Sequence, residues 1–149
     1  MIANVRAFFD RYLATTAPEQ DDDHRLQIAS AALMIELINA DHETSPEEEA
    51  MLDEILVEHF QLSAQEKQDL IDLAHTEKHE ATDYYRFTSL LNQHYSQQDK
   101  IDLVENLWRL AYADRHIDKF EEHLIRRLAD LLHVPHADFM QAKHRATDA

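Results

Sequence analysis

The sequence contains no cysteine and no glycine, and only three of its 149 residues are proline. Without cysteine there is no disulfide framework, no thiolate zinc site and no cysteine nucleophile. Without glycine there is no glycine-rich phosphate-binding loop, and the tight hairpin turns that favour glycine are disfavoured. Because Ala, Leu, Glu, Gln, Asp and His dominate instead, the composition predicts helices rather than strands.

Basic residues are also few: 14 Lys and Arg stand against 30 Asp and Glu, which gives a net charge of −16. A field of that sign repels DNA, RNA and anionic membranes, so the sequence predicts no nucleic-acid partner. Cations and basic protein surfaces match this charge better, and we expect a protein partner. Solubility alone is the alternative explanation for the acidic composition.

Long uncharged apolar runs are missing, because no stretch approaches the roughly 18 residues that a membrane-spanning helix needs. The first residues, MIANVRAFFDRYLA, are amphipathic and carry Arg6, Asp10 and Arg11. They therefore lack the uninterrupted apolar segment of a signal peptide. We predict a cytoplasmic protein that does not insert into a membrane.

The apolar pattern predicts an all-α bundle of seven or eight helices that forms a single domain over residues 1–149. A helix is expected at 2–14, followed by a polar linker, TTAPEQDDD, at 15–23. Residues 24–40 and 97–113 are rich in apolar side chains, and we predict that both form central buried helices. The remaining helices are expected at 46–60, 63–77, 80–95 and 119–133, with a short last helix after Pro135.

Three of these helices begin with a predicted capping box, in which an N-cap side chain and an acid three residues later bind each other's backbone amides. The predicted pairs are Ser45 with Glu48, Ser63 with Glu66, and Asp118 with Glu121. Each pair therefore predicts where one helix begins.

An internal repeat relates the two halves of residues 24–145. Shifting the sequence by 73 positions places Ile28 on Ile101 and Asp41 on Asp114. Each unit consists of an apolar helix, a short acidic loop and an amphipathic helix. Because one unit cannot bury its apolar helix alone, we expect two pseudo-symmetric helix–loop–helix repeats that share one core.

The two repeated loops each carry an aspartate seven positions before a glutamate: Asp41 before Glu48, and Asp114 before Glu121. Each aspartate lies where one helix ends and each glutamate in the first turn of the next, so a short turn can bring the carboxylates together. Oxygen ligands on a bend suit a hard divalent cation, Ca²⁺ or Mg²⁺ rather than Zn²⁺. The alternative is structural, because both glutamates also complete capping boxes and complement a helix dipole.

The segments ADHETSPEEEAML and ADRHIDKFEEHLI resemble the paired Ala-Asp-Gly-x-Ile-x-x-x-Glu signature of the TerB family, which also includes the N-terminal domain of the DjlA co-chaperones. The resemblance covers about residues 24–145. The sequence departs from the signature where glycine is expected, since His42 and Arg115 occupy that position. The isoleucine position is Thr44 in the first copy and Ile117 in the second.

This resemblance implies an all-helical protein linked to tellurite resistance and stress response, with an acidic surface implicated in binding divalent cations. Carried onto this chain, the implied ligands are Asp41 and Glu48 in the first loop, and Asp114 and Glu121 in the second.

Other side chains are weaker candidates for metal binding. They are Glu49 and Glu122 beside the loop glutamates, and His75 and His79, which lie four residues apart on one predicted helix face. No set of nucleophile, base and orienting residue stands out, so we predict a non-enzymatic protein.

Two hypotheses follow. In the first, a TerB-like stress module binds a divalent cation or a basic partner through its two acidic loops. In the second, a co-chaperone-like interaction domain uses the same acids only to cap helices and to set its surface charge.

Overall fold

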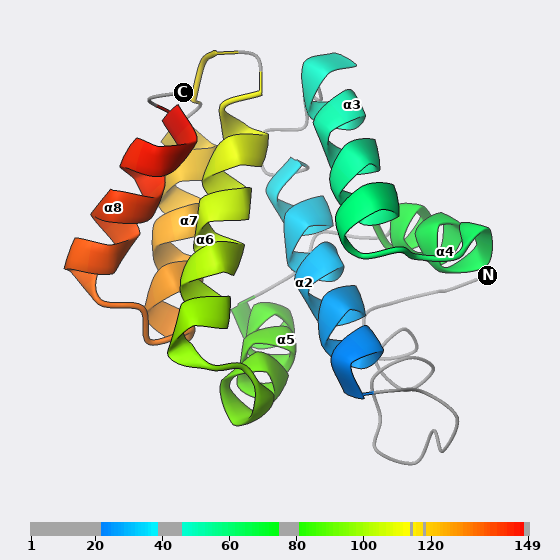
Figure 1. Cartoon of the computed structure of the whole chain (residues 1–149), viewed down its shortest axis with the longest axis horizontal. Helices are drawn as coiled ribbons and strands as arrows, with labels where there is room; N and C mark the ends of the chain where they lie inside the picture. The colour runs from blue at the N-terminus through cyan, green and yellow to red at the C-terminus, as the bar shows by residue number, and fades with distance from the viewer. Residues whose placement is uncertain (1–21, 39–45, 75–80, 114, 118, 148–149) are drawn as a thin grey trace.

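The computed structural model describes residues 22–38, 46–74, 81–113, 115–117 and 119–147. Within these segments the chain forms seven α-helices and one π-helix, and no strand (Figure 1). They are α2 (Asp22–Ile38), α3 (Pro46–Glu54), the π-helix η1 (Ile55–His59), α4 (Ala64–Ala74), α5 (Ala81–His94), α6 (Gln97–Ala111), α7 (Lys119–Leu131) and α8 (His136–Thr147). The predicted all-α fold is confirmed, whereas the helix predicted at 2–14 lies outside the described residues.

The centre of the bundle is α2, which lies between α6 on one side and α3 and α4 on the other, with α5 packed across it (Figure 1). All described side chains from Ile28 to Leu37 are buried. A helix that is apolar on nearly all sides is stable in water only when other helices cover it, so the composition of α2 accounts for its central place. The predicted burial of this segment is confirmed.

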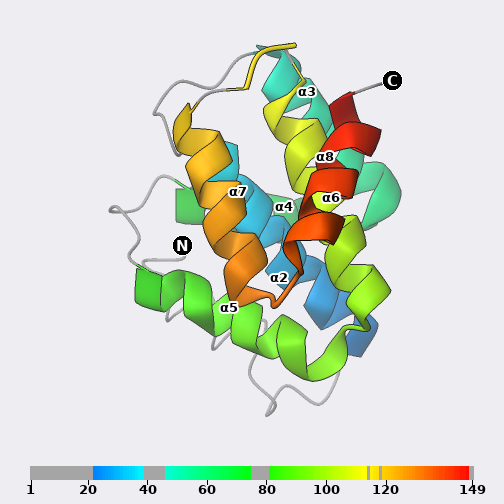
Figure 2. The same ribbon diagram turned by 90° about the vertical axis from the view of Figure 1, so that its left-hand side faces the viewer.

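The second predicted central helix, α6, contacts α2, α3, α7 and α8 and buries its apolar side chains among them. Val104, Leu107 and Trp108 are fully buried, and this side packs against α8 and α7 (Figure 2). Asp102 is exposed and Ile101 is partly exposed. The predicted burial is therefore confirmed for the apolar side of α6, while polar side chains that recur on another face keep that face in solvent.

Two capping boxes fix helix starts in the described part of the chain. At α4, the Ser63 amide donates to Glu66 Oε1 at 2.8 Å and the Glu66 amide donates to Ser63 Oγ at 3.1 Å, as the sequence predicts. At α6, Ser96 and Asp99 form a second capping box, which was not among the three predicted ones. Residues 45 and 118 are not among the described residues, so the two other predicted boxes stay predictions.

Glu66 of the α4 capping box also connects α4 to α2 through a hydrogen bond with His24. His24 Nε2 lies 2.6 Å from Glu66 Oε2, so one carboxylate binds both its own helix start and the first turns of α2. Burial by itself raises the pKa of Glu66, but hydrogen bonds from the Ser63 amide and from His24 outweigh it and hold the pKa below its ordinary value. The ionised carboxylate is therefore the form that the fold stabilises.

The helix predicted at 46–60 changes its hydrogen-bond pattern part-way. It is α-helical to Glu54 and then widens into η1, where the Phe60 amide donates to Ile55 O, five residues back, at 3.1 Å. Gln61 then has a φ of 52°, which turns the chain toward α4. Phe60, which follows the wide turn, is partly buried against the core, and such π-helical turns are frequent near functional sites.

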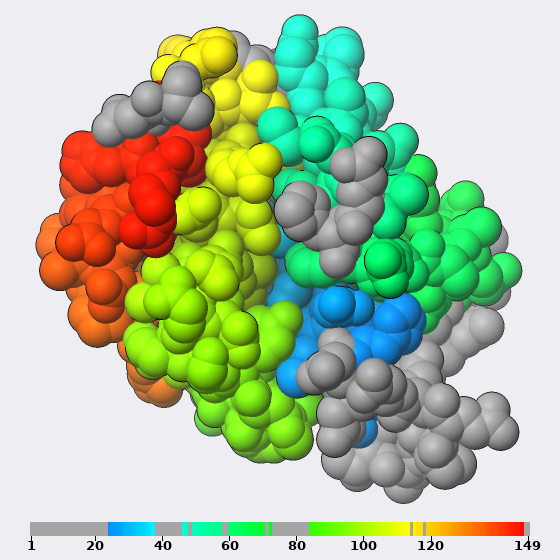
Figure 3. Space-filling model, viewed as in Figure 1, coloured from blue at the N-terminus to red at the C-terminus, as the bar shows by residue number. Residues whose placement is uncertain are grey.

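No helix in the described segments is long and apolar enough to cross a membrane. On the face shown in Figure 3, the atoms of α2 are visible mainly near its N-terminal end, beside α6.

Candidate functional site

The second acidic loop begins where α6 ends. The Tyr112 amide donates to Trp108 O at 2.9 Å, and the Arg115 amide donates to Tyr112 O at 2.9 Å. Arg115 has a φ of 67°, the left-handed region that favours glycine. The TerB signature has glycine at this position, so the arginine adopts the backbone conformation that a glycine would adopt more easily.

Arg115→Gly is therefore expected to stabilise the protein by about 0.5 kcal/mol. Relief of the left-handed arginine favours the variant by about 1–2 kcal/mol, while the added freedom of glycine in the unfolded chain opposes it by about 0.5–1 kcal/mol. The variant also loses the contact between the Arg115 guanidinium and the Tyr112 ring, 5.9 Å from the ring centroid, and this loss reduces the net stabilisation further. Urea unfolding measures the difference.

The control is Arg127→Gly, which removes the same side chain from an exposed, helical position in α7. It is expected to destabilise the protein by about 1 kcal/mol. Equal destabilisation by both substitutions would show that the left-handed turn at Arg115 carries no strain.

The glutamate of the second loop, Glu121, lies in the first turn of α7 and is only 2% exposed. Its neighbour Glu122 is partly exposed and lies 3.8 Å from Arg126, one turn along the helix. Of the two adjacent acids, the structure therefore directs Glu121 inward and leaves Glu122 at the surface. An inward carboxylate fits both hypotheses, since either a capping contact or a bound cation lowers the free energy of a buried charge.

Most of the other predicted ligands lie outside the described residues. These are Asp41, the side chain of Glu48, Asp114, His75 and His79. Glu49 is described and is exposed on α3. Among the described residues, no three His, Asp or Glu side chains approach one another closely enough to hold a metal ion.

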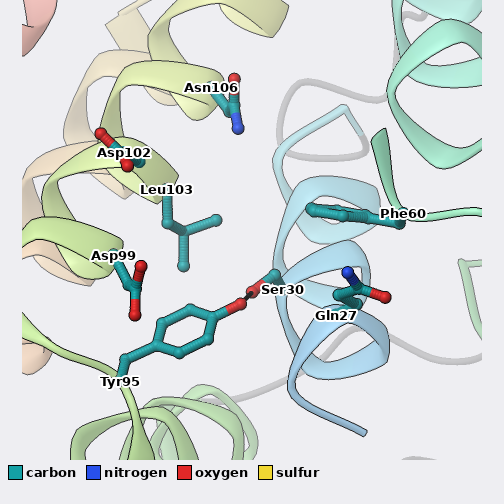
Figure 4. A pocket seen from close by; sticks show the side chains of 8 residues that line it. All are labelled: Gln27, Ser30, Phe60, Tyr95, Asp99, Asp102, Leu103 and Asn106. Atoms are coloured by element: carbon teal, nitrogen blue, oxygen red, sulfur yellow. Dashed lines mark hydrogen bonds between the residues drawn. The ribbon is translucent and has the colours of Figure 1, made fainter. Parts of the chain in front are cut away.

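A pocket of about 440 Å³ opens between α2 and α6 (Figure 4). One wall is a single face of α6 that carries Asp99, Asp102, Leu103 and Asn106. These residues follow the i, i+3, i+4, i+7 spacing that places side chains on one side of a helix. This polar face of α6 was not predicted, because the prediction for this helix rested on its apolar residues, although the spacing is present in the sequence.

The opposite wall comes from three other parts of the chain. Gln27 and Ser30 project from α2, Phe60 follows the π-helix, and Tyr95 lies between α5 and α6 (Figure 4). The Ser30 and Tyr95 hydroxyls are 2.9 Å apart, and the Tyr95 hydroxyl also donates to Leu26 O at 3.4 Å. These bonds hold the tyrosine against α2, so the wall is formed without a ligand.

A family model described as Tellurite resistance protein TerB matches residues 27–144. The chain belongs to the TerB family. The match includes both acidic loops and the helices on either side of the pocket, so the resemblance of the two loop segments extends over most of the chain. No curated protein and no solved structure gives a significant match.

Membership makes this chain a TerB-type helical module of a family associated with tellurite resistance. The match covers α6, the turn at Arg115 and α7, so the left-handed arginine belongs to a loop within the family region.

Proposed function

We propose that this TerB module is non-enzymatic and binds a divalent cation or a basic protein partner through its two acidic loops. The observation that supports the proposal is the second loop, where a left-handed turn at Arg115 leads into α7 and the carboxylate of Glu121 lies buried at the helix start. The net charge of −16 favours cations and basic surfaces in the same way.

We propose that each of the two acidic loops forms the same kind of binding site. The shift of 73 positions that relates Asp41 to Asp114 also relates Glu48 to Glu121, so the two halves offer the same acids at the same spacing. Hard oxygen ligands favour Ca²⁺ or Mg²⁺ over Zn²⁺, which prefers nitrogen and sulfur. The stress-response role implied by the family belongs to the same proposal.

The experiment is thermal unfolding of the whole chain in Ca²⁺, Mg²⁺, Mn²⁺ and Zn²⁺. An ion that binds only the folded state adds about 1.4 kcal/mol at ten times its Kd, which for a chain of this length raises Tm by about 3–6 °C. The double variant Asp41→Asn/Asp114→Asn should lose most of that rise. Its ion-free stability should equal or exceed that of the wild type, because two repelling charges are removed.

The matched control is Asp72→Asn/Asp130→Asn, which removes two charges from α4 and α7 outside the loops. It should keep the full response. If the wild type shows no rise at millimolar ion, or both double variants lose it equally, the cation proposal is wrong. A basic partner or the second hypothesis, a co-chaperone-like domain whose loop acids only cap helices, then explains the acids.

A further inference from the structure

The pocket between α2 and α6 shares no residue with the acidic loops and has no role in the proposed function. Its volume of about 440 Å³ lies within the range of small-molecule sites, roughly 300–1,000 Å³. A cavity of that size and a polar lining are two properties that helix packing alone does not require.

The charge of the pocket is negative. Asp99 and Asp102 stand on the α6 wall, and none of the lining residues is Lys, Arg or His. In the described part of the chain neither carboxylate forms an ion pair: Asp99 Oδ2 accepts from the Ser96 amide at 3.2 Å, and Asp102 Oδ1 accepts from Gln98 Nε2 at 2.9 Å. The α6 N-terminus adds about half a positive charge, which is smaller than the two negative charges beside it.

The rest of the lining favours an organic cation. The rings of Phe60 and Tyr95 and the Leu103 side chain offer apolar and aromatic surface, and aromatic faces attract cations. Figure 4 shows Gln27 and Phe60 on one side of the cavity, with Asp99 and Asp102 on the other. A hydrated metal ion gains nothing from such rings, and the described residues bring no three metal-ligating side chains together.

The upper end of the pocket is less negative. Asn106 lies at this end of the pocket (Figure 4). Arg109 Nη1 donates to Asn106 Oδ1 at 3.5 Å, so a protein guanidinium lies beside it. A second positive group is repelled at that end and attracted to the end with Asp99. The two ends therefore impose a direction on an elongated ligand.

We propose that this pocket binds a small aliphatic amine or guanidine. Its charged group lies beside Asp99 and Asp102, and its hydrocarbon part lies against Phe60 and Leu103. The hydroxyl groups of Ser30 and Tyr95 belong to the wall opposite α6, and the hydrogen bonds between them and from Tyr95 to Leu26 O hold this wall in place before a ligand binds.

The test is titration of the ¹⁵N-labelled whole chain with butylamine, with butylguanidine and, as an inorganic cation, with Mg²⁺, at about 150 mM salt to screen surface charge. The side-chain amides of Gln27 and Asn106 are expected to shift with butylamine or butylguanidine, and their titration curves give Kd. A stronger response to butylguanidine assigns the guanidinium as the preferred group, and a stronger response to butylamine assigns the ammonium. Gln68, on α4, is expected to stay unchanged.

Asp102→Asn is expected to weaken amine binding about tenfold, the effect of losing one charge-assisted contact. The matched control is Asp72→Asn. Asp72 accepts from Gln68 at 3.0 Å, four residues earlier, just as Asp102 accepts from Gln98, but it lies outside the pocket. The control removes the same charge and the same helical contact, and should keep Kd within about twofold of the wild type.

Gln27→Lys gives an independent test that leaves both carboxylates in place. The new ammonium lies at the pocket wall and competes with the ligand, so binding should fall by at least about tenfold. Gln68→Lys carries the same charge change on α4 and should bind normally. The proposal is overturned if neither butylamine nor butylguanidine shifts Gln27 and Asn106 at 10 mM, if Mg²⁺ produces the same shifts, or if each variant and its control lose affinity equally.

Discussion

Trp108→Ala is expected to lower the free energy of unfolding by about 3–5 kcal/mol, the usual cost of removing a large buried aromatic side chain. Trp108 is fully buried, and its ring lies 5.2 Å from the Phe139 ring of α8, tilted by 53°. Lys143 Nζ, also on α8, lies 5.1 Å from the Trp108 centroid. The substitution therefore removes the main aromatic contact between α6 and α8, and urea unfolding measures the loss.

The loss is large because a domain of this size has only about 5–15 kcal/mol of stability in total. Trp108→Phe should cost much less, since the phenyl ring keeps part of the packing. Trp108 Nε1 is buried, and among the described residues it has no hydrogen-bond partner. Trp108→Phe removes this unsatisfied donor and with it the free-energy cost of burying it.

The control is Phe120→Ala, at an aromatic side chain on α7 that is 56% exposed. Its effect should stay within about 0.5 kcal/mol, as for most surface substitutions. A loss at Phe120 as large as the loss at Trp108 would show that burial of Trp108 against α8 contributes no more to stability than an exposed aromatic ring does.

Glu66→Ala is expected to lower the free energy of unfolding by about 2.5–4 kcal/mol at neutral pH. It removes the acceptor for the Ser63 amide, worth about 1 kcal/mol as a capping contact, and the 2.6 Å contact with His24, a hydrogen bond to a charged group worth about 1.5–3 kcal/mol. The second contact joins α2 to α4, so its loss weakens tertiary packing and not only one helix end.

The difference in stability between the wild type and Glu66→Ala should decrease as the pH falls. The pKa of Glu66 is lowered in the folded protein, so this group stabilises the fold above the ordinary glutamate pKa. That contribution is lost as the pH falls through the lower folded value. The gap between wild type and Glu66→Ala should therefore be full at pH 7 and shrink below about pH 4.

Asp99→Ala is the matched control, because Ser96 and Asp99 form the same capping box at α6 without a histidine. It should cost about 1 kcal/mol. Equal losses at Glu66 and Asp99 would mean that the contact with His24 contributes nothing, and a gap that does not change with pH would contradict the lowered pKa of Glu66.

Helix positions followed closely from local pattern. The Ser63 and Glu66 pair predicted the start of α4, and the apolar run after residue 24 predicted a buried α2. Both are local effects, because a capping box needs only four residues and an apolar circumference is a property of one helix. The pattern did not distinguish an α-turn from a π-turn at residues 55–59, since both bury the same apolar side chains.

The candidate sites were less accessible from the sequence than the helices were. The acidic loops were found because they repeat, and the family match includes them, but their role as ligands stays a prediction. The α2–α6 pocket was not found, because its lining joins Ser30, Phe60 and Asp102, which are far apart in the chain. Nothing local to any one of these residues indicates that the others lie beside it.

By itself, then, the sequence determined an acidic, all-helical protein with a buried second helix, because composition, periodicity and capping act within a few turns of chain. The resemblance to the TerB family came from the two loop segments. The tertiary structure alone decided that α6 is buried on one side and opens a polar pocket on another. It also decided that Arg115 occupies a glycine conformation. These features depend on which helices pack against one another, and the packing of the whole core determines that arrangement rather than any single segment.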